Sequence, residues 1–393
     1  MSTISQNKNK FLILPSTTTS TSTIFVDTSY EKLSTGLGPS PSYGYQPAFD
    51  SQRNLYVVGQ FTTAGGVSVN NIAKWDGSSW SNVGGGTNGY LLSIYIDPSD
   101  NIYVGGQFSR CDPTGVNLAV RNIAKWDGSA WSDVGGGTNG SVFSINKNNN
   151  GDILVGGSFT SVGIGGTLLS TVNISSWNGS SWFNYAGGIG INFAGDLIRK
   201  IIVLQNKIYV CGRFTSTNTV PAIITNNIAM WDGSWNALGL GLNGDTYTMV
   251  TNGIDKIYCA GGFSTAGGIP TNSGLAVYNV NTLSWSTLPP NGFGSSLDIE
   301  IDQLENLYVS GNNNYIRKFN GTIWSNAATG FNNFVREMVI ISNGIDLYVT
   351  GFFTMINSEV YNYVAKIIVA HNETITTTRS SIILLPLTKK RFN

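Results

Sequence analysis

The chain has a single histidine, His371, and only three cysteines among its 393 residues. A Ser-His-Asp triad needs a histidine in a core site, whereas His371 lies beyond the last recognisable repeat of the sequence. Zinc sites built on several histidines are excluded, and no two cysteines have the CxxC spacing of metal or redox motifs. The sequence therefore predicts no enzyme of these classes, no cofactor and no disulfide framework.

Charged residues are also scarce, at 11% of the chain against roughly 25% in a typical soluble protein. The 22 basic residues equal the 22 acidic ones, so the formal net charge is zero. A protein that grips nucleic acid by neutralising phosphates needs an excess of basic side chains. No nucleic-acid partner is therefore expected.

Long apolar runs are missing as well. No stretch reaches the roughly 18 apolar residues of a membrane-spanning helix, so no membrane span is expected. The N-terminal apolar run, FLILP (11–15), is shorter than the roughly 7–15 residues of a secretory signal. We expect cytoplasmic synthesis without a signal peptide.

The asparagine-rich composition favours an AT-rich genome, such as that of a protist or its large DNA viruses. Incorporation into a virion or filament is therefore one hypothesis for the location of the protein.

What the chain has in abundance is glycine, with 48 residues, and internal repetition. The segment NNIAKWDGSSWSNVGGGTNG begins at Asn70 and RNIAKWDGSAWSDVGGGTNG at Arg121. Weaker copies begin at Val172 and Asn226. The fifth and sixth copies are degenerate and read GLAVYNVNTLSW and YIRKFNGTIW. A second motif, of the form LYVVGQF, starts at Leu55, Ile102, Ile153, Ile208, Ile257, Leu307 and Leu347.

Each repeat predicts four short antiparallel strands, which we call a, b, c and d. In the second repeat they cover 91–97, 102–108, 122–126 and 130–134. Asp-Gly between two short aromatic and β-branched runs predicts a tight hairpin between strands c and d. Four such strands in a period of roughly 40–55 residues are typical of one blade of a β-propeller.

The last repeat is split between the two ends of the chain. Segments 334–340, 347–353 and 363–369 supply strands a to c, but no WDGSxW hairpin follows them. Residues 29–38 align with the missing strand, with Tyr30 at the tryptophan position and Leu33 at the valine position. An N-terminal strand over 29–35 would close the ring and cover its open edges.

The sequence thus predicts an all-β fold: a single seven-bladed β-propeller of four-stranded antiparallel blades over residues 29–369, with the last blade closed by the N-terminal strand. Two tails, 1–28 and 370–393, remain outside the blade count. Each holds a five-residue apolar segment, 11–15 and 382–386, which we expect to form an added strand that pairs with the other tail or with a neighbouring subunit.

These motifs resemble the NIAKWDG and YVGG-F repeats of bacterial, fungal and protist repeat proteins, including the fungal cortical polarity-marker proteins. They are more distantly similar to kelch and WD-repeat propellers. The resemblance covers about 340 residues. It implies the propeller fold, and it implies no catalytic residue, cofactor or particular ligand, because propellers serve many functions.

All ten tryptophans lie in the WDGSxW hairpin or its degenerate copies, which predicts one structural role repeated. We expect them to pair across strands c and d and to pack between blades; the alternative is stacking against sugars. They are Trp75, Trp80, Trp126, Trp131, Trp177, Trp182, Trp231, Trp235, Trp285 and Trp324.

Two candidate sites follow from the blade pattern. The b–c loops are long and dissimilar, and with the d–a loops they share one face, which we expect to be the contact surface. Strand a lines the channel, and its alignment brings Asp298, Glu300 and Glu337 together on the last two blades. Such carboxylates could serve glycan hydrolysis, hold a hard cation, or simply line a hydrated channel, the last being favoured.

The leading functional hypothesis is a non-enzymatic structural or protein-interaction propeller that binds a protein partner or self-assembles through its loop face and tails. The scarcity of histidine and charge favours it. A carbohydrate-binding lectin with a glycan partner is the first alternative, and a glycan hydrolase using the channel carboxylates is the second.

Overall fold

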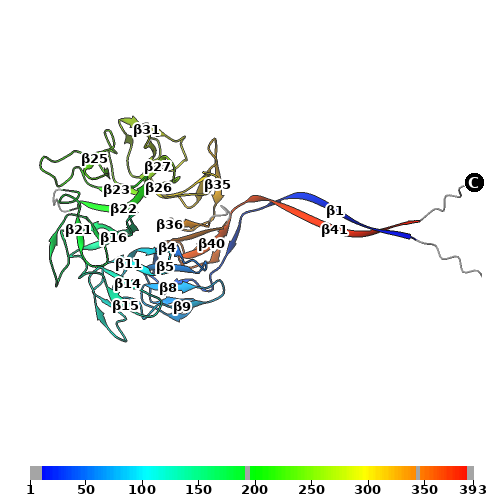
Figure 1. Ribbon diagram of the computed structural model, residues 1–393, viewed down its shortest axis with the longest axis horizontal. Helices are drawn as coiled ribbons and strands as arrows, with labels where there is room; N and C mark the ends of the chain where they lie inside the picture. Colours follow the sequence, from blue (N-terminus) through cyan, green and yellow to red (C-terminus); the bar gives the residue numbers. More distant parts are fainter. Residues whose placement is uncertain (1–10, 191–194, 342–345, 387–393) are drawn as a thin grey trace, which may run out of the picture. The chain divides into compact units, whose positions relative to one another are not determined.

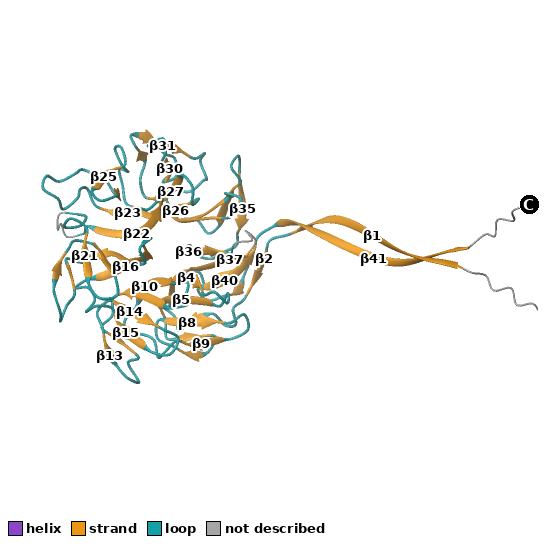
Figure 2. Ribbon diagram, in the orientation of Figure 1, coloured by secondary structure: helices purple, strands orange, loops and turns teal. Residues whose placement is uncertain are grey.

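The computed structural model describes residues 11–190, 195–341 and 346–386. Within these ranges the chain forms strands, turns and loops (Figure 2), and no helix there could span a membrane. The predicted all-β class is confirmed. The chain divides into two compact units, residues 29–369 and the paired terminal segments 1–28 and 370–393; residues 1–10 and 387–393 of the predicted tails lie outside the described residues.

The unit 29–369 contains seven four-stranded antiparallel sheets among the residues described. Six are built from consecutive segments in the order a-b-c-d. Blades 1 to 3 are β4 (Tyr43–Phe49), β5 (Leu55–Gln60), β8 (Ile72–Trp75), β9 (Trp80–Asn82); β10 (Leu91–Ile96), β11 (Ile102–Gly106), β14 (Ile123–Trp126), β15 (Trp131–Asp133); and β16 (Ser141–Lys147), β17 (Ile153–Ser158), β20 (Ile174–Trp177), β21 (Trp182–Asn184).

Blades 4 to 6 repeat the same order. They are β22 (Leu197–Leu204), β23 (Lys207–Arg213), β24 (Ile228–Trp231), β25 (Trp235–Ala237); β26 (Thr246–Thr251), β27 (Lys256–Gly261), β30 (Leu275–Asn279), β31 (Ser284–Thr287); and β32 (Ser296–Ile301), β33 (Leu307–Gly311), β34 (Ile316–Phe319), β35 (Trp324–Ala328).

Blade 7 combines the two ends of the unit, as the sequence predicts. Its order is β36 (Val335–Ile340), β37 (Asp346–Gly351), β40 (Val364–Ile368) and β2 (Ser29–Glu31). Tyr30 lies opposite Ile367 in the β2–β40 ladder. The closing strand is shorter than the expected 29–35, because the chain turns after Glu31 and pairs again as β3 (Leu37–Gly38) with β6 (Thr63–Ala64) of the next blade.

The sheets are arranged in a ring, with β4, β16, β22 and β36 toward its middle and β9, β15, β21, β25 and β31 at its rim (Figure 1). Each inner strand contacts the inner strand of the next blade, and β36 contacts β4, which closes the circle. Seven hydrophobic clusters fill the interfaces between neighbouring blades. The core is therefore a ring of interfaces, and the number of sheets agrees with the predicted seven blades.

A hydrogen bond from the outer strand recurs at every blade interface. The indole Nε1 of Trp131 donates to the carbonyl oxygen of Gly84 in the preceding blade at 2.7 Å. The same bond is made by Trp80, Trp182, Trp235, Trp285 and Trp324. In blade 7 the phenol of Tyr30 replaces the indole and donates to the carbonyl of Thr329 at 3.0 Å. Tyr30 thus completes the set in the closing strand.

The second unit is a two-stranded antiparallel ribbon. Strand β1 (Phe11–Val26) pairs with β41 (His371–Pro386) over its whole length, from Phe11 opposite Pro386 to Val26 opposite His371 (Figure 1). The apolar segments 11–15 and 382–386 lie opposite each other at one end of this ribbon. The two tails therefore pair within one chain.

Candidate functional site

The antiparallel order of each blade gives the ring two faces of different construction. We call the side with the b–c and d–a connections the loop face, and the side with the a–b and c–d connections the turn face. On the loop face the b–c connections form small hairpins of their own in blades 1, 2, 3, 5 and 7: β6–β7 (Val67–Ser68), β12 (Arg110–Cys111)–β13 (Leu118–Ala119), β18 (Ser161–Val162)–β19 (Leu169–Ser170), β28 (Thr265–Ala266)–β29 (Ile269–Pro270) and β38 (Met355–Ile356)–β39 (Glu359–Val360).

Asparagine side chains join these hairpins to the preceding blade. Asn139, in the d–a loop after blade 2, accepts hydrogen bonds from the backbone N–H groups of Thr160 and Ser161 in blade 3 and donates to the Thr160 hydroxyl at 2.8 Å. Asn88, Asn243 and Asn332 make the corresponding contacts at other interfaces. The loop face is therefore an ordered surface, held by bonds between blades.

This ordered surface exposes aliphatic side chains. In six of the seven blades the b–c connection carries at least one large hydrophobic residue open to solvent; Val116, for example, is 83% exposed. The set comprises Val67, Val116, Leu168, Val220, Ile224, Ile269 and Val360. Leu240, in the d–a loop after blade 4, adds to it. Because they recur around one ordered face, that face is the candidate contact surface.

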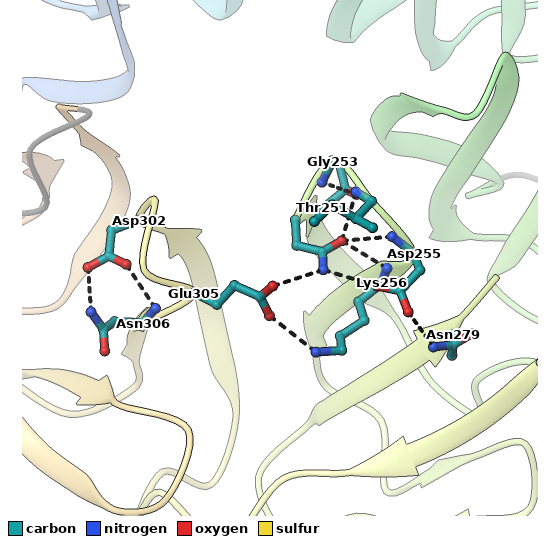
Figure 3. Close-up of polar contacts among 10 residues, drawn as sticks. Thr251, Gly253, Asp255, Lys256, Asn279, Asp302, Glu305 and Asn306 are labelled. Atoms are coloured by element: carbon teal, nitrogen blue, oxygen red, sulfur yellow. Dashed lines mark hydrogen bonds and ion pairs between the residues drawn. The ribbon is translucent and has the colours of Figure 1, made fainter. Parts of the chain in front are cut away.

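The turn face is built from short turns that satisfy their own polar groups. Asp127 accepts hydrogen bonds from the backbone N–H groups of Ala130 and Ser129 and from the Ser129 hydroxyl, and these bonds lower the pKa of its carboxyl to about 2. Contacts between blades occur here too: Glu305 of blade 6 accepts from Lys256 Nζ at 3.1 Å and from the Asn252 amide of blade 5 (Figure 3).

The exposed aliphatic side chains described on the turn face cluster on two neighbouring blades. They are Ile254, Leu283, Leu304 and Ile323, from the a–b and c–d turns of blades 5 and 6. The turn face therefore offers a local patch, whereas the loop face offers a nearly complete circle.

The inner strands of the seven blades align with one another as the sequence predicts. The first predicted position pairs with an equivalent residue of strand b in each blade: Ser93, Ser144, Lys200, Thr248, Asp298 and Glu337. Gln46 occupies this position in blade 1. A cavity of about 200 Å³ runs along these residues and is lined by Gln46, Ser144, Lys200, Thr248 and Glu337, among others.

Several of these side chains tie one blade to the next. Gln46 accepts a hydrogen bond from the backbone N–H of Ile94 at 2.9 Å, and Ser144 accepts from that of Ile201 at 3.0 Å. Asp298 accepts from the N–H of Met338 at 2.7 Å. Asp298 is buried and structural in this arrangement.

Glu337 occupies the same position in blade 7 but lacks this partner. The residue that would donate from blade 1 is Pro47, which has no backbone N–H. Burial, with the Asp298 carboxylate, raises the pKa of Glu337 to about 8, and the positive charges of Lys200 and Arg336 oppose this rise. Burial, with the carboxylates of Asp298 and Glu337, raises the pKa of Glu300 to about 8 as well, and Lys200 opposes this rise.

Lys200 balances this acidic side of the channel. Burial alone would lower its pKa, but the carboxylates of Glu337, Asp298 and Glu300 raise it above the usual value. The described residues contain no group of three or more His, Cys, Asp or Glu side chains arranged to hold a metal ion, and the cation alternative for the three carboxylates stays a prediction. The hydrolase alternative stays a prediction, with Asp298 engaged in a bond between blades.

Every inner strand contains a β-bulge, which the repeat pattern of the sequence does not predict. Each a–b ladder shifts register at the same place, just before the first channel position. The extra residues are Tyr45, Leu92, Phe143, Arg199, Tyr247, Leu297 and Arg336. Because strand a starts at the loop face, these seven residues surround the channel mouth on that face. Their position one residue before the aligned channel position is the only sequence signal for them.

The tryptophan pairs lie between strands c and d, as in Trp126 and Trp131, whose ring centroids are 5.3 Å apart. The indole N–H groups of the outer tryptophans are engaged by the preceding blade. The lectin alternative needs aromatic faces free for sugars, and these contacts do not favour it.

Comparisons with known proteins support the fold. No family model and no curated protein matches the sequence. Among solved structures, the chain is similar to the WD40 β-propeller domain of Doa1, with a TM-score of 0.55 and 13% identity over 86% of this chain and 96% of that one. It is also similar to the extracellular domain of a putative one-component system from B. thetaiotaomicron, with a TM-score of 0.57 and 11% identity; the match covers 86% of this chain but only 39% of that one. At these identities the likeness shows a propeller fold alone.

Proposed function

We propose that the chain is a non-enzymatic interaction propeller that binds a protein partner through its loop face. The observation that carries this proposal is the circle of exposed aliphatic side chains, one or more in the b–c connection of six blades. Binding residues are usually carried by connections on a rigid scaffold, and the repetition of exposed aliphatic groups in these connections supports the loop face as the contact surface.

The order of the loop face supports the same function. The asparagine bonds between d–a loops and hairpins hold the aliphatic groups in fixed positions, so little conformational entropy is lost on binding. The zero net charge of the chain gives no long-range steering. We therefore expect recognition by apolar contact, with weak dependence on salt.

The test compares two matched triple variants in capture of partners from cells that produce the chain. The first carries Val116→Ser, Leu168→Ser and Val220→Ser on the loop face; the second carries Ile254→Ser, Leu283→Ser and Leu304→Ser on the turn face. Because all six side chains are exposed, both variants should keep the melting temperature of the wild type.

We expect the loop-face variant to lose at least tenfold in captured partner and the turn-face variant to retain it. Loss in the turn-face variant alone would transfer the function to the patch on blades 5 and 6. Retention in both variants would contradict an interaction by exposed aliphatic groups.

Self-association through the ribbon is a second candidate. A two-stranded ribbon leaves one edge of each strand without partners, and such edges accept further strands. Light scattering of the full chain and of a variant lacking residues 1–27 and 374–393 tests it. An oligomer that becomes a monomer on deletion supports this role; a full-length monomer contradicts it.

A further inference from the structure

The seven β-bulges place two arginines at the channel mouth. Six of the seven bulge residues line one cavity of about 240 Å³, together with Phe334 and Glu337. Arg199 and Arg336 come from blades 4 and 7, so they enter this cavity from two separate sectors of the ring. A bulge turns a side chain away from the regular alternation of its strand, which is how residues next to the channel positions reach the mouth.

Both guanidinium groups have a donor that makes no hydrogen bond to the protein. The Nε atoms of Arg199 and Arg336 are buried without a hydrogen-bond partner. Arg199 approaches one carboxylate, with its Nη2 at 3.9 Å from Asp245 Oδ2, which is the long limit of an ion pair. Arg336 has no ion pair with any carboxylate among the described residues. A buried donor without a partner costs free energy, and neither arginine is fully engaged by the protein itself.

Aromatic rings hold the two arginines in place. The guanidinium carbon of Arg336 lies 4.7 Å from the ring centroid of Tyr45, and that of Arg199 lies 5.3 Å from the ring centroid of Tyr247. An arginine stacked on a ring keeps its donors in one plane, which suits a planar, two-oxygen acceptor. The orientation is therefore set before any ligand arrives.

The rest of the cavity wall combines four apolar side chains with Tyr247 and Glu337. Leu92, Phe143, Leu297 and Phe334 line it, and none of them offers a hydrogen bond. Two cationic donors beside these four apolar side chains match a carboxylate attached to a compact hydrophobic group.

We propose that the channel mouth is a binding site for a carboxylate carried on a small apolar group, with Arg199 and Arg336 as its ligand-binding residues. Two sources share this chemistry, a free organic acid and the C-terminal residue of a polypeptide. The site lies inside the ring of inner strands, so it does not depend on the aliphatic circle of the loop face.

Isothermal titration calorimetry of the purified chain tests the proposal. The probe is 3-phenylpropionate, and 3-phenylpropionamide is its uncharged match. We expect saturable binding of the acid and at least tenfold weaker binding of the amide. Arg199→Gln and Arg336→Gln should each weaken binding of the acid about tenfold or more, since a hydrogen bond to a charged group contributes about 1.5–3 kcal/mol.

Two further variants separate recognition from general effects. Arg121→Gln removes an exposed cation from the same face and should leave affinity unchanged. Arg336→Lys keeps the charge but loses the planar fork, so its affinity should fall between those of the wild type and Arg336→Gln. A melting temperature equal to that of the wild type shows that a variant is folded. If Arg336→Gln melts at a lower temperature, Arg336→Lys takes its place in the comparison of affinities with the wild type.

The source is distinguished with acetyl-Gly-Gly-Phe and its C-terminal amide. Tighter binding of the peptide acid than of 3-phenylpropionate assigns the site to a chain end; equal or weaker binding assigns it to a free acid. Either result supports the proposal. Three results would overturn it: no saturable binding of either acid, binding of the amides as tight as that of the acids, or binding of inorganic phosphate and not of the acids. None of these results bears on partner capture by the loop face.

Discussion

The two faces of this propeller use the same residue type in opposite ways. On the loop face, Asn139 bonds to the backbone of the next blade. On the turn face, Asn178 bonds to the backbone N–H groups of Ser180 and Ser181 within its own hairpin. Both asparagines are exposed, so burial does not distinguish them. The loop face is a continuous structure around the ring, whereas the turn face is mostly a set of separate turns.

This difference explains how long connections can form a binding surface. A long loop usually adds mobility, but here the b–c connections of six blades are paired with the d–a loop beside them, as in the bridges between Thr87 and Cys111 and between Thr138 and Val162. The aliphatic groups of the loop face are thus presented by a rigid support. The turn face has shorter connections, and its exposed aliphatic groups are restricted to two blades.

The largest expected effect distinguishes the glycines of the two faces. Gly86, on the loop face, has φ +68°, and a Cβ there would overlap the carbonyl oxygen of Asn70. Gly77, on the turn face, has φ +98° and open space around the same position. We expect Gly86→Ala to lower the free energy of unfolding by about 3 kcal/mol and Gly77→Ala by about 1 kcal/mol, measured by urea denaturation. Equal losses in the free energy of unfolding would show that the strain of a positive φ determines both effects and that the overlap with Asn70 adds nothing.

A smaller effect is expected for the asparagine pair. Asn139→Ala removes three hydrogen bonds between blades and should cost about 2 kcal/mol, since each bond contributes about 0.5–1.5 kcal/mol. Asn178→Ala removes bonds within one turn and should cost less than about 1 kcal/mol. Urea denaturation of both variants measures the difference. A larger loss for Asn178→Ala would reverse the contrast between the faces.

The channel and the turn face should also respond to pH with opposite signs. The folded-state pKa of Glu300 is raised to about 8, above the unfolded value of about 4.3, so its proton stabilises the fold and this contribution is lost as the pH rises toward 8. Glu300→Gln should therefore reduce the loss of stability between pH 5 and pH 8, measured by urea denaturation at both values.

Asp127 on the turn face provides the control for this experiment. Its pKa is lowered to about 2, so its contribution is present above about pH 4 and is lost only in stronger acid. Asp127→Asn should leave the slope between pH 5 and pH 8 unchanged. A slope that is the same in the wild type and in Glu300→Gln would show that Glu300 is ionised in the folded channel.

The smallest effects are expected for the exposed aliphatic groups. Leu168→Ser on the loop face and Leu304→Ser on the turn face should each change the free energy of unfolding by less than about 0.5 kcal/mol. Thermal and urea denaturation check this. A loss of more than about 1 kcal/mol for Leu168→Ser would mean that the side chain supports the fold and is a poor candidate for a partner contact.

Much of the scaffold is visible in the sequence. The YVGG-F and WDGSxW motifs mark strands b, c and d in nearly every blade, because each motif repeats one structural role. The position of Tyr30 in the alignment predicts the closing strand, and its phenol makes the bond between blades that tryptophan makes elsewhere. The channel register is also predicted, since alternate residues of a strand face one side.

The channel mouth is not predicted by the same logic. A bulge adds one residue without breaking the apolar pattern of the strand, so a period of two places Arg199 and Arg336 on the wrong side of strand a. The partner of each channel residue depends on the neighbouring blade, as with Pro47 beside Glu337, and adjacency between blades is a property of the ring. The asparagine of the Gly-Gly-Gly-Thr-Asn-Gly segments is predictable, because Asn88 and Asn139 recur at one repeat position.

The contrast between the faces is tested most directly by site-specific photocrosslinking. A benzoylphenylalanine is placed at Leu168 on the loop face or at Leu304 on the turn face, and the chain is irradiated in the cells that produce it. Both positions are exposed, so both can capture a neighbour. We expect a discrete crosslinked partner from position 168 and none from position 304. A partner captured only from position 304 would contradict binding through the loop face.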